Sequence, residues 1–376
     1  MTVRSERSRV LFVIPALGGG GAYRVLVTLL KHFDRSLLDL QLAVLNTAGG
    51  VFRDEIPEDV EFVDLRSPRV RFALPKIVGL VRKLRPHVVF TISGHLSLGL
   101  ALAKPLLPHG VRVIGRETSM VSRALESQRL TPLWRLAYSQ FYPRLDRVVC
   151  QSEEMYEDLI RNFNFSPRKL VVINNPVDVA RVRELIESEL PPQPGRPSPS
   201  ASGPPLRLVA AGRLSPAKGF DLLIQAVAKC PELQIELELL GTGQLEVELR
   251  QMSRALGVDG RIRFLGFQEN PYPFFARADA FVLSSRFDGF PNVVLEALAC
   301  GTPVIATPAP GGVREILAPI PECEIARSVS ADDLAAALRS WSDRRPGRVS
   351  ELAIEPYSVQ AIVRRYESEI LSLARS

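Results

Sequence analysis

The stretch SSRFDGFPNVVLEALACGTP, residues 284–303, lies between two short apolar runs, 280–283 and 304–306, that have the composition of buried strands. Its Gly-Phe-Pro segment marks a tight loop, after which residues 292–298 can form a helix. A strand, a loop, a helix and a second strand in this order are the repeating unit of a parallel sheet covered by helices. The stretch therefore predicts an α/β fold.

Apolar runs of the same kind recur along the chain and alternate with segments of helical spacing. Before residue 191 they are 10–14, 40–45, 88–91, 111–115, 147–150 and 170–173, and after residue 205 they begin with 206–211, 234–240 and 262–265. This alternation predicts two Rossmann-like, doubly wound domains. Ligands bind beyond the carboxyl ends of the strands in such sheets, so we expect a central cleft between the domains and the chemistry on loops that follow strands.

A proline-rich segment separates the two sets of strands, because seven of the fifteen residues from 191 to 205 are proline. We therefore predict an N-terminal domain over residues 1–185, a linker or surface loop over 186–205 and a C-terminal domain over 206–356. The last segment, 357–376, repeats apolar residues on one helical face, which predicts a helix that must pack on another part of the chain.

The overall composition is that of an ordinary globular protein, with 46% hydrophobic and 23% charged residues and a net charge of +6. This charge suits anionic ligands but is too diffuse to predict nucleic-acid binding. The four cysteines lie far apart and form no CxxC pair, which favours a reducing cytoplasm. No apolar stretch approaches the ~20 residues of a membrane-spanning helix, and the apolar run near the N-terminus is interpreted as a first strand rather than a signal peptide.

Two carboxylates flank the start of the predicted helix in the quoted stretch. Asp288 lies in the loop just before it, and Glu296 lies about one turn inside it. The free N–H groups at a helix N-terminus can hold a phosphate or sugar hydroxyls. The two carboxylates would then reach different parts of one extended ligand, an interpretation we prefer to a capping Asp and a solvated Glu.

A second loop, AGRLSPAKGF at residues 211–220, brings two cations together after a predicted strand. The guanidinium of Arg213 and the ammonium of Lys218 can clamp a diphosphate and stabilise it as it leaves. Two unrelated surface charges are the alternative interpretation, which their shared position after one strand disfavours. The four histidines do not cluster and no DxD pair follows a strand, so we expect no metal and no other cofactor.

A glycine-rich loop, Gly18 to Gly21, follows the first predicted strand. Backbone without side chains can approach a ligand closely, so Gly19, Gly20 and Gly21 are candidate binding residues. The dinucleotide pattern GxGxxG fails, because no glycine stands where its third one should be. A dehydrogenase is therefore disfavoured.

Taken together, these stretches resemble the retaining glycosyltransferase family 4, which has the GT-B fold, over nearly the whole chain. That family has a glycine-rich loop after its first strand, an Arg and a Lys in a GR(x)nKG loop, and two acidic residues separated by seven others. The corresponding residues are Gly18 to Gly21, Arg213 with Lys218, and Asp288 with Glu296. Also similar are Asn174, Asn175 and Pro176 at the domain junction, and Gly241 to Gly243 after a strand. The resemblance implies that the final helix crosses back to the N-terminal domain.

The resemblance also implies a role for each of these residues. Arg213 and Lys218 would bind the donor phosphates, Glu296 the ribose hydroxyls, and Asp288 the transferred sugar. The other expected substrate contacts are the backbone of Gly289, Phe290, Pro291 and Asn292 for the sugar, Gly241, and Gly266 with Phe267 near the nucleobase. Retention would proceed by front-side attack, with the leaving phosphate taking the acceptor's proton.

Two positions depart from the family pattern. The first acidic position is usually Glu but is Asp288 here, and Asp is one methylene shorter, so its contact with the sugar is altered or bridged by water. Where many members carry a histidine in the N-terminal domain, this chain has Arg116 and Glu117. His95 is a further candidate on the acceptor side, against the alternative of a structural loop histidine.

Basic and aromatic residues are interleaved between residues 121 and 147, where five arginines stand among Leu130, Trp134, Tyr138, Phe141 and Tyr142. A second stretch, 66–85, carries seven Lys and Arg and no acidic residue. Such segments suit an anionic membrane surface, which would make the protein peripheral on the inner face of the cell membrane. A solvated helix face with ordinary core aromatics explains them equally well.

The expected activity is transfer of a hexose or N-acetylhexosamine from a nucleotide diphosphate sugar to a glycan or polyprenyl-linked acceptor in surface polysaccharide synthesis. The GFPN loop, residues 116–119 and GGVREI at 311–316 resemble the corresponding segments of family members that use UDP-hexoses or UDP-N-acetylhexosamines, and this resemblance implies a UDP-sugar. Two alternatives stay open: a GDP-mannose-dependent mannosyltransferase, and a catalytically silent protein that binds a sugar nucleotide or a partner transferase. A phosphorylase would need a Schiff-base lysine and a longer chain, and an epimerase its own acid and base residues.

Overall fold

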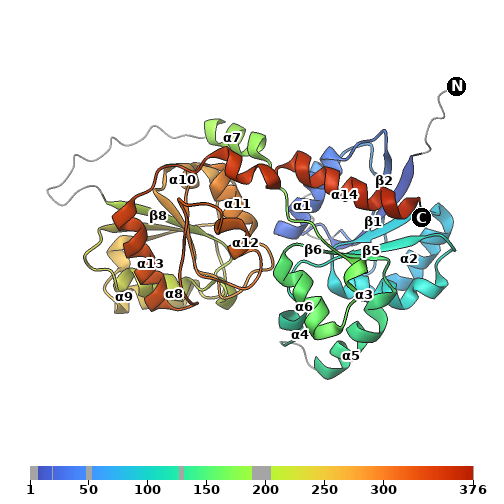
Figure 1. Cartoon of the computed structure of the whole chain (residues 1–376), viewed down its shortest axis with the longest axis horizontal. Coiled ribbons are helices and arrows are strands. Elements are labelled where there is room, and N and C mark those ends of the chain that lie inside the picture. Colours follow the sequence, from blue (N-terminus) through green and yellow to red (C-terminus); the bar gives the residue numbers. More distant parts are fainter. Residues whose placement is uncertain (1–6, 19, 48–52, 127–130, 189–204, 376) are drawn as a thin grey trace. The chain divides into compact units, whose positions relative to one another are not determined.

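The computed structural model describes residues 7–18, 20–47, 53–126, 131–188 and 205–375. The chain divides into two compact units, the first formed by Met1–Pro176 with Val359–Ser376 and the second by Val177–Ser358 (Figure 1). Each unit is built on its own parallel sheet. This confirms the α/β fold with two Rossmann-like domains that the alternation of strands and helices predicted.

The sheet of the first unit has the strand order β3-β2-β1-β4-β5-β6-β7. The strands are β1 (Ser8–Ala16), β2 (Leu38–Asn46), β3 (Glu61–Asp64), β4 (Val88–Thr91), β5 (Arg112–Arg116), β6 (Arg147–Cys150) and β7 (Leu170–Val172). Successive residues of β1 point to opposite faces, so that Leu11 and Val13 pack in one core layer and Phe12 and Ile14 in the other. Because both faces are buried, the inner strands are continuous apolar runs.

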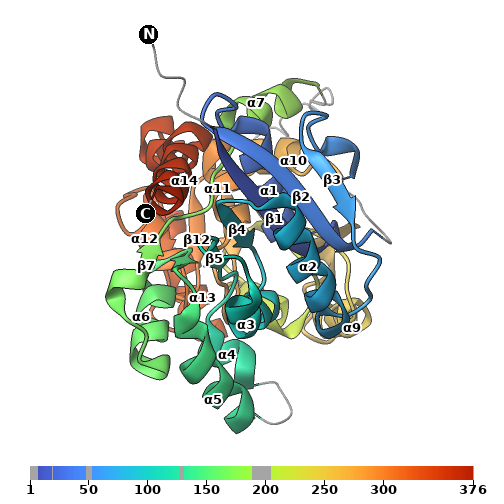
Figure 2. The same ribbon diagram turned by 90° about the vertical axis from the view of Figure 1, so that its right-hand side faces the viewer.

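Helices cover both faces of this sheet. α1 (Gly21–His32) and α14 (Val359–Ala374) cover one face, and α2 (Val70–Leu84), α3 (Gly94–Ala103), α4 (Val121–Glu126), α5 (Thr131–Phe141) and α6 (Glu153–Phe163) the other. Figure 2 shows β1, β2 and β3 side by side, with α2 next to them. No helix in the described part of the chain is long and apolar enough to span a membrane.

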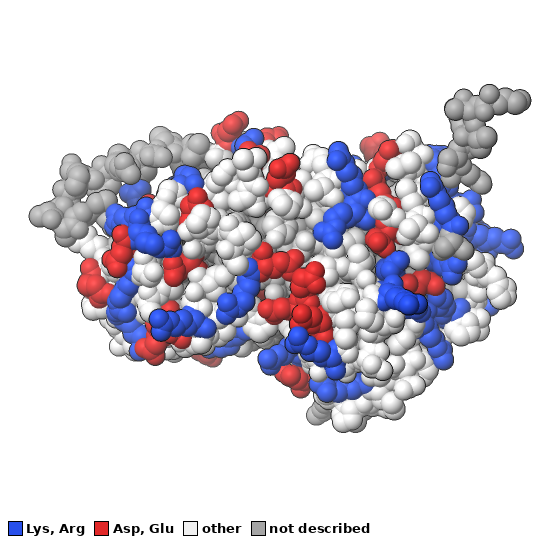
Figure 3. Space-filling view, in the orientation of Figure 1, with Lys and Arg blue, Asp and Glu red and all other residues white. Residues whose placement is uncertain are grey.

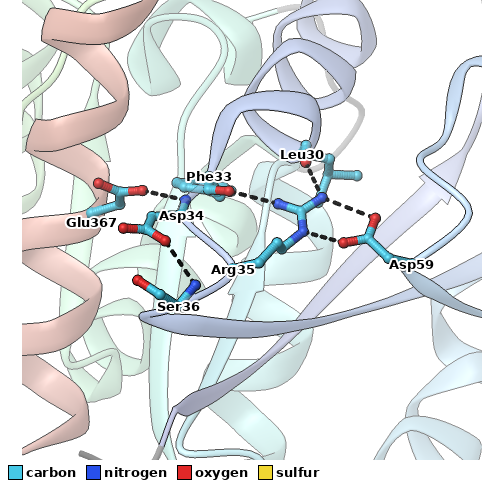
Figure 4. Close-up of polar contacts among 7 residues, drawn as sticks. All are labelled: Leu30, Phe33, Asp34, Arg35, Ser36, Asp59 and Glu367. Atoms are coloured by element: carbon cyan, nitrogen blue, oxygen red, sulfur yellow. Dashed lines mark hydrogen bonds and ion pairs between the residues drawn. The ribbon is translucent and has the colours of Figure 1, made fainter.

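The C-terminal helix α14 belongs to the first unit, as the resemblance implied. One side of it is apolar and is buried against α1 and the sheet. Glu367 of α14 also accepts a hydrogen bond of 2.7 Å from the backbone N–H of Asp34, just after α1 (Figure 4). The same turn is held by Arg35, which binds the carboxylate of Asp59 and two backbone carbonyls of residues 30 and 33. The last helix is therefore part of this unit's core.

The sheet of the second unit has the strand order β10-β9-β8-β11-β12-β13. Its strands are β8 (Leu206–Ala211), β9 (Ile235–Leu240), β10 (Ile262–Gly266), β11 (Ala280–Leu283), β12 (Val304–Ala306) and β13 (Glu324–Ile325). One face is covered by α8 (Phe220–Ala228), α9 (Glu246–Ala255) and α13 (Ala331–Arg344), the other by α7 (Val179–Ser188), α10 (Tyr272–Arg277), α11 (Asn292–Ala299) and α12 (Val313–Leu317). The chain order reverses between β8 and β11, and ligands bind at such switch points.

The boundary between the units differs from the predicted division. We predicted an N-terminal domain up to residue 185, whereas the second unit begins at Val177. The reason is α7: its Val182 is buried in the core of the second unit, and its Leu185 carbonyl accepts a hydrogen bond from Asn270. Helical spacing of apolar residues predicts a helix but not the sheet on which it packs. Most of the predicted linker, residues 189–204, lies outside the described part of the chain.

Candidate functional site

The loops that follow β8 and β11 are bound to each other at the switch point of the second unit. The hydroxyl of Ser284 donates to the Lys218 carbonyl at 2.9 Å, and the N–H of Arg286 donates to the Ala217 carbonyl at 2.8 Å. The guanidinium of Arg286 also binds both carboxylate oxygens of Asp221, at 2.7 and 2.6 Å. These bonds join the loop with the two predicted cations to the loop with the first predicted carboxylate.

Two glycines permit the close approach of these loops. Gly219 has a φ of +61°, and a Cβ on it would lie 2.1 Å from the Ser284 carbonyl oxygen. Gly311, in the loop after β12, has a φ of +125°, and a Cβ on it would lie 1.7 Å from the Asp288 carbonyl oxygen. Neither position can hold a side chain without displacing backbone. The Asp288 N–H also donates to the Pro310 carbonyl at 3.1 Å, so the loop after β12 fixes the backbone of Asp288.

The structure brings Lys218 and Asp288 into contact, although 70 positions separate them in the chain. Their side chains form an ion pair and are 26% and 17% exposed, so the pair is partly buried but within reach of a ligand. Arg213 stands in different surroundings. Its side chain is exposed, and within the described residues its guanidinium has no hydrogen-bond or ion-pair partner. The two predicted cations therefore differ, because one is already paired and the other is not.

The segment from Gly289 to Asn292 leads into α11 and buries its side chains. Phe290 and Pro291 are buried, and the Phe290 ring packs against Tyr357 with 6.1 Å between ring centroids. A ligand at this segment would therefore meet its backbone, as predicted for the sugar site. Asn292 begins α11, whose positive dipole end lies there. Glu296 follows in the second turn of α11 and is half-buried.

The predicted nucleobase residues lie next to the loop that follows β9. The N–H of Gly241 donates to the Gly266 carbonyl at 2.7 Å, which places the ends of β9 and β10 together. The loop after β9 in turn contacts the loop after β8, because the Leu214 N–H donates to the Thr242 carbonyl at 2.9 Å. Phe267 is 75% exposed, so its ring is open to a stacking partner. The assignment of these residues to a nucleobase stays a prediction.

In the first unit, Gly20 and Gly21 lie at the start of α1. Gly20 is the residue before the helix, has an extended backbone, and accepts hydrogen bonds of 3.1 Å from the N–H groups of Tyr23 and Arg24. Gly21 is the first helical residue. Gly19, the third predicted member of this loop, lies outside the described residues. That the loop approaches a ligand stays a prediction.

Arg116 and Glu117 are buried at the end of β5, 0% and 4% exposed. Arg116 donates from Nε to the Tyr366 hydroxyl on α14 at 2.9 Å and from Nη2 to Asn175 Oδ1 at 2.6 Å. Its Nη1 has no partner among the described residues. Gln151 connects the set, since it donates to the Glu117 carbonyl at 2.8 Å and accepts from Asn175 at 3.1 Å. This network was not predicted from the sequence, because its members lie far apart in the chain.

The Glu117 carboxyl accepts a hydrogen bond from the Tyr142 hydroxyl. Burial, with a smaller contribution from the charge of Asp158, raises the pKa of Glu117 to about 8. The carboxyl is therefore mostly protonated at neutral pH. Tyr142 and Tyr138, which the sequence placed in a basic and aromatic surface segment, are 1% and 4% exposed. Both belong to the core of the first unit, because this segment packs against α3 and α6.

His95 lies at the exposed start of α3, and its ring meets that of Trp134 edge-on with centroids 5.2 Å apart. This contact fits the structural alternative as well as a role toward the acceptor. Among the described residues, no three His, Cys, Asp or Glu side chains form a group that could hold a metal ion.

Large apolar side chains are exposed on the helices of the first unit that pack around α3. They are Phe72 on α2 (55%), Leu102 on α3 (44%), Leu106 just after it (56%), and Leu133 and Leu136 on α5 (61% and 56%). The guanidinium of Arg71 lies over the Phe72 ring at 4.8 Å, and Arg82 binds the Leu106 carbonyl at 3.0 Å. Figure 3 shows a largely uncharged surface over α5, bordered by charged side chains of both signs.

Two family models match the chain, one in each half. "Glycosyltransferase Family 4" matches residues 19–181, and "Glycosyl transferases group 1" matches residues 196–355. An N-acetylgalactosaminyltransferase of Campylobacter jejuni, named for an undecaprenyl-diphosphate-linked acceptor, is 27% identical, over 81% of this chain and 81% of its own. The lipopolysaccharide core biosynthesis glycosyltransferase LpsE of Rhizobium meliloti is 28% identical, over 71% of this chain and 80% of its own.

Solved structures of other proteins resemble this chain at the level of the fold. The structure of HepE from Anabaena in complex with UDP superposes with a TM-score of 0.77, at 20% identity, over 97% of this chain and 100% of that one. Its sequence identity is too low to show more than the fold. With both halves matched by the family models and two Rossmann-like units of the GT-B type in place, the chain belongs to glycosyltransferase family 4 and is a glycosyltransferase.

Proposed function

We propose that this enzyme transfers a hexose or N-acetylhexosamine from a UDP-sugar to a glycan or polyprenyl-linked acceptor, with retention at the anomeric carbon and without a metal ion. The observation that carries the proposal is the ion pair between Lys218 and Asp288, which joins two loops at the switch point of the second unit, with Arg213 in the same loop as Lys218. A cation paired with a carboxylate, with a second cation in the same loop, suits a ligand with an anionic diphosphate and a neutral, hydroxyl-rich sugar.

In the proposed reaction the bond between the anomeric carbon and the donor phosphate oxygen breaks. The acceptor oxygen forms a bond to the same face of that carbon, and its proton moves to the leaving phosphate. Arg213 and Lys218 stabilise the charge that develops on this phosphate, a task that a divalent cation performs in other transferases. Asp288 and the backbone of residues 289–292 position the sugar, and Glu296 binds the ribose.

The names of similar proteins support the proposed classes of donor and acceptor. HepE was crystallised with UDP, and the C. jejuni relative is named for a diphospho-undecaprenol-linked acceptor. The R. meliloti relative is named for lipopolysaccharide core synthesis. An acceptor of this class is anchored in a membrane. The exposed apolar residues of α2, α3 and α5, with Arg71 over the Phe72 ring of α2, suit a peripheral contact with an anionic bilayer on the cytoplasmic side.

A donor panel tests the proposal. The purified enzyme is incubated with UDP-, GDP- and ADP-sugars, and binding and slow hydrolysis of each donor are measured. We expect binding and hydrolysis of a UDP-hexose or UDP-N-acetylhexosamine in the presence of EDTA. Turnover of GDP-mannose alone would replace the donor assignment, binding without any turnover would favour a silent sugar-nucleotide-binding protein, and loss of activity in EDTA would remove the metal-free mechanism.

A further inference from the structure

The ion pair between Lys218 and Asp288 joins two groups that the proposed function assigns to different parts of the donor. Lys218 is assigned to the diphosphate, and Asp288 to the sugar. In the structure their side chains bind each other. The donor phosphates must therefore compete with Asp288 for the ammonium of Lys218.

The backbones on both sides of this pair are held in place. The Lys218 carbonyl accepts a hydrogen bond from the Ser284 hydroxyl, and the Lys218 N–H donates one to the Ser215 carbonyl at 3.0 Å. The neighbouring Gly219 lies against the Ser284 carbonyl in the loop after β11. Asp288 is held by Pro310 and by the close approach of Gly311. The two side chains can therefore exchange partners without movement of either loop.

The two halves of the donor have opposite effects on this pair. A diphosphate that takes the ammonium leaves the Asp288 carboxylate, only 17% exposed, without its partner and beside a second anion. Removing one partner from a partly buried ion pair is unfavourable, because the remaining charge is poorly solvated. A sugar on the diphosphate relieves this cost, since its hydroxyls can donate hydrogen bonds to the carboxylate.

We propose that Asp288 acts as a sugar-dependent gate on Lys218: it yields the ammonium to a diphosphate readily when a sugar is attached, and competes for it when the sugar has left. The gate rests on the proposed function and deepens it. It favours the intact donor over the nucleoside diphosphate product, so the transfer step itself restores the competition that expels the product. Arg213, exposed and without a partner in the described residues, binds phosphate in both cases and does not discriminate.

Binding of UDP to three proteins tests the gate: wild type, Asp288→Asn and, as the matched control, Glu246→Gln. Glu246 lies at the start of α9, in the same unit, and pairs with Arg250 one turn along its own helix. Both substitutions remove one negative charge, but only the first frees Lys218. Kd is measured by calorimetry for UDP and for the UDP-sugar that the donor panel identifies, with thermal melting as the check on folding.

We expect Asp288→Asn to bind UDP roughly fivefold more tightly than wild type, as loss of a competing ion pair of intermediate exposure implies, and to bind the UDP-sugar no more tightly than wild type. Glu246→Gln should stay within about twofold of wild type for both ligands, as expected for an exposed pair within one helix. Unchanged or weaker UDP binding by a folded Asp288→Asn variant, or an equal gain in Glu246→Gln, would overturn the gate. If no protein of the three binds UDP, the UDP assignment itself fails and the gate falls with it.

Discussion

Lys218 and Arg213 come from one short loop, yet only Lys218 has an internal partner in the described residues. The difference follows from position: Lys218 lies in a turn that is bound to the loop after β11, whereas Arg213 lies at the exposed start of the loop that follows β8. A cation held in place by its surroundings loses less side-chain entropy when it binds a phosphate than a mobile one. Lys218 should therefore contribute most to the chemical step.

Lys218→Ala is expected to lower kcat/KM for sugar transfer by roughly 100-fold or more, because a preorganised charge on the leaving phosphate is lost. The fold should persist, since the pair is partly exposed. Lys229→Ala is the control, as Lys229 forms an exposed pair with Asp332 in the same unit and should behave like wild type. Steady-state kinetics and circular dichroism measure both. Wild-type turnover in a folded Lys218→Ala enzyme would remove the phosphate assignment.

The buried carboxyl of Glu117 predicts how the stability of the first unit depends on pH. Its pKa in the folded protein is about 8, against 4.5 for an ordinary Glu. Between these values the folded protein holds a proton that the unfolded chain has released, so the stability contributed by this group is present at low pH and is lost as the pH rises. Glutamine cannot ionise and can still accept the hydrogen bond from Tyr142.

Accordingly, Glu117→Gln should gain stability over wild type as the pH is raised from about 5.5 to about 8.5, with a relative rise in Tm of about 3 °C or more for the transition of the first unit. Scanning calorimetry at several pH values measures this difference. Parallel Tm curves for the two proteins would show that Glu117 ionises normally in the folded state.

At the scale of elements, the loops after the strands position the candidate donor-site residues. The loop after β12 holds the backbone of Asp288 because Gly311 has no side chain. Gly311→Ala would place a side chain on a residue with positive φ, where its Cβ clashes with the Asp288 carbonyl. We expect the backbone conformation alone to lower the free energy of unfolding by roughly 1–3 kcal/mol. Displacement of Asp288 should also lower kcat/KM by roughly tenfold or more.

Gly257→Ala is the matched control for this loop. Gly257 lies in the same unit with a φ of +68°, and a Cβ on it would meet no atom within 4 Å. The control should lose stability but keep its kcat/KM. Thermal melting and kinetics separate the two effects, and equal activity losses in both variants would mean that the loop after β12 does not position Asp288.

At the scale of the molecule, exposed apolar side chains of the first unit are the proposed contact with the membrane. A protein with both Leu133→Ser and Leu136→Ser should co-sediment with anionic vesicles roughly threefold less than wild type, because it buries less apolar surface in the bilayer. Val247→Ser with Leu256→Ser is the control, since these residues are also apolar and exposed (67% and 43%) but belong to the second unit. High salt should release the wild type. No vesicle binding by wild type at low salt would contradict the proposal.

Most elements of the fold were predictable, because buried strands and amphipathic helices have a local periodicity of apolar residues that shows which side chains are buried. Two strands, β3 and β13, were missed. β3 has the sequence EFVD and lies at the edge of its sheet, and β13 has two residues, so neither shows an apolar run. The assignment of α7 to the N-terminal domain was wrong for a related reason: its period marks a buried face but not the unit that buries it.

The sequence by itself determined that the chain has two parallel α/β units, and it marked Arg213, Lys218, Asp288 and Glu296 as candidate residues, because short-range spacing encodes both. Only the tertiary structure decided that Lys218 pairs with Asp288, that Arg116 joins Tyr366 and Asn175, and that Glu117 is buried with a raised pKa. The physical reason is the same in each case. Charge pairing and desolvation depend on which loops meet at a sheet edge, and that meeting is set by packing between residues far apart in the chain.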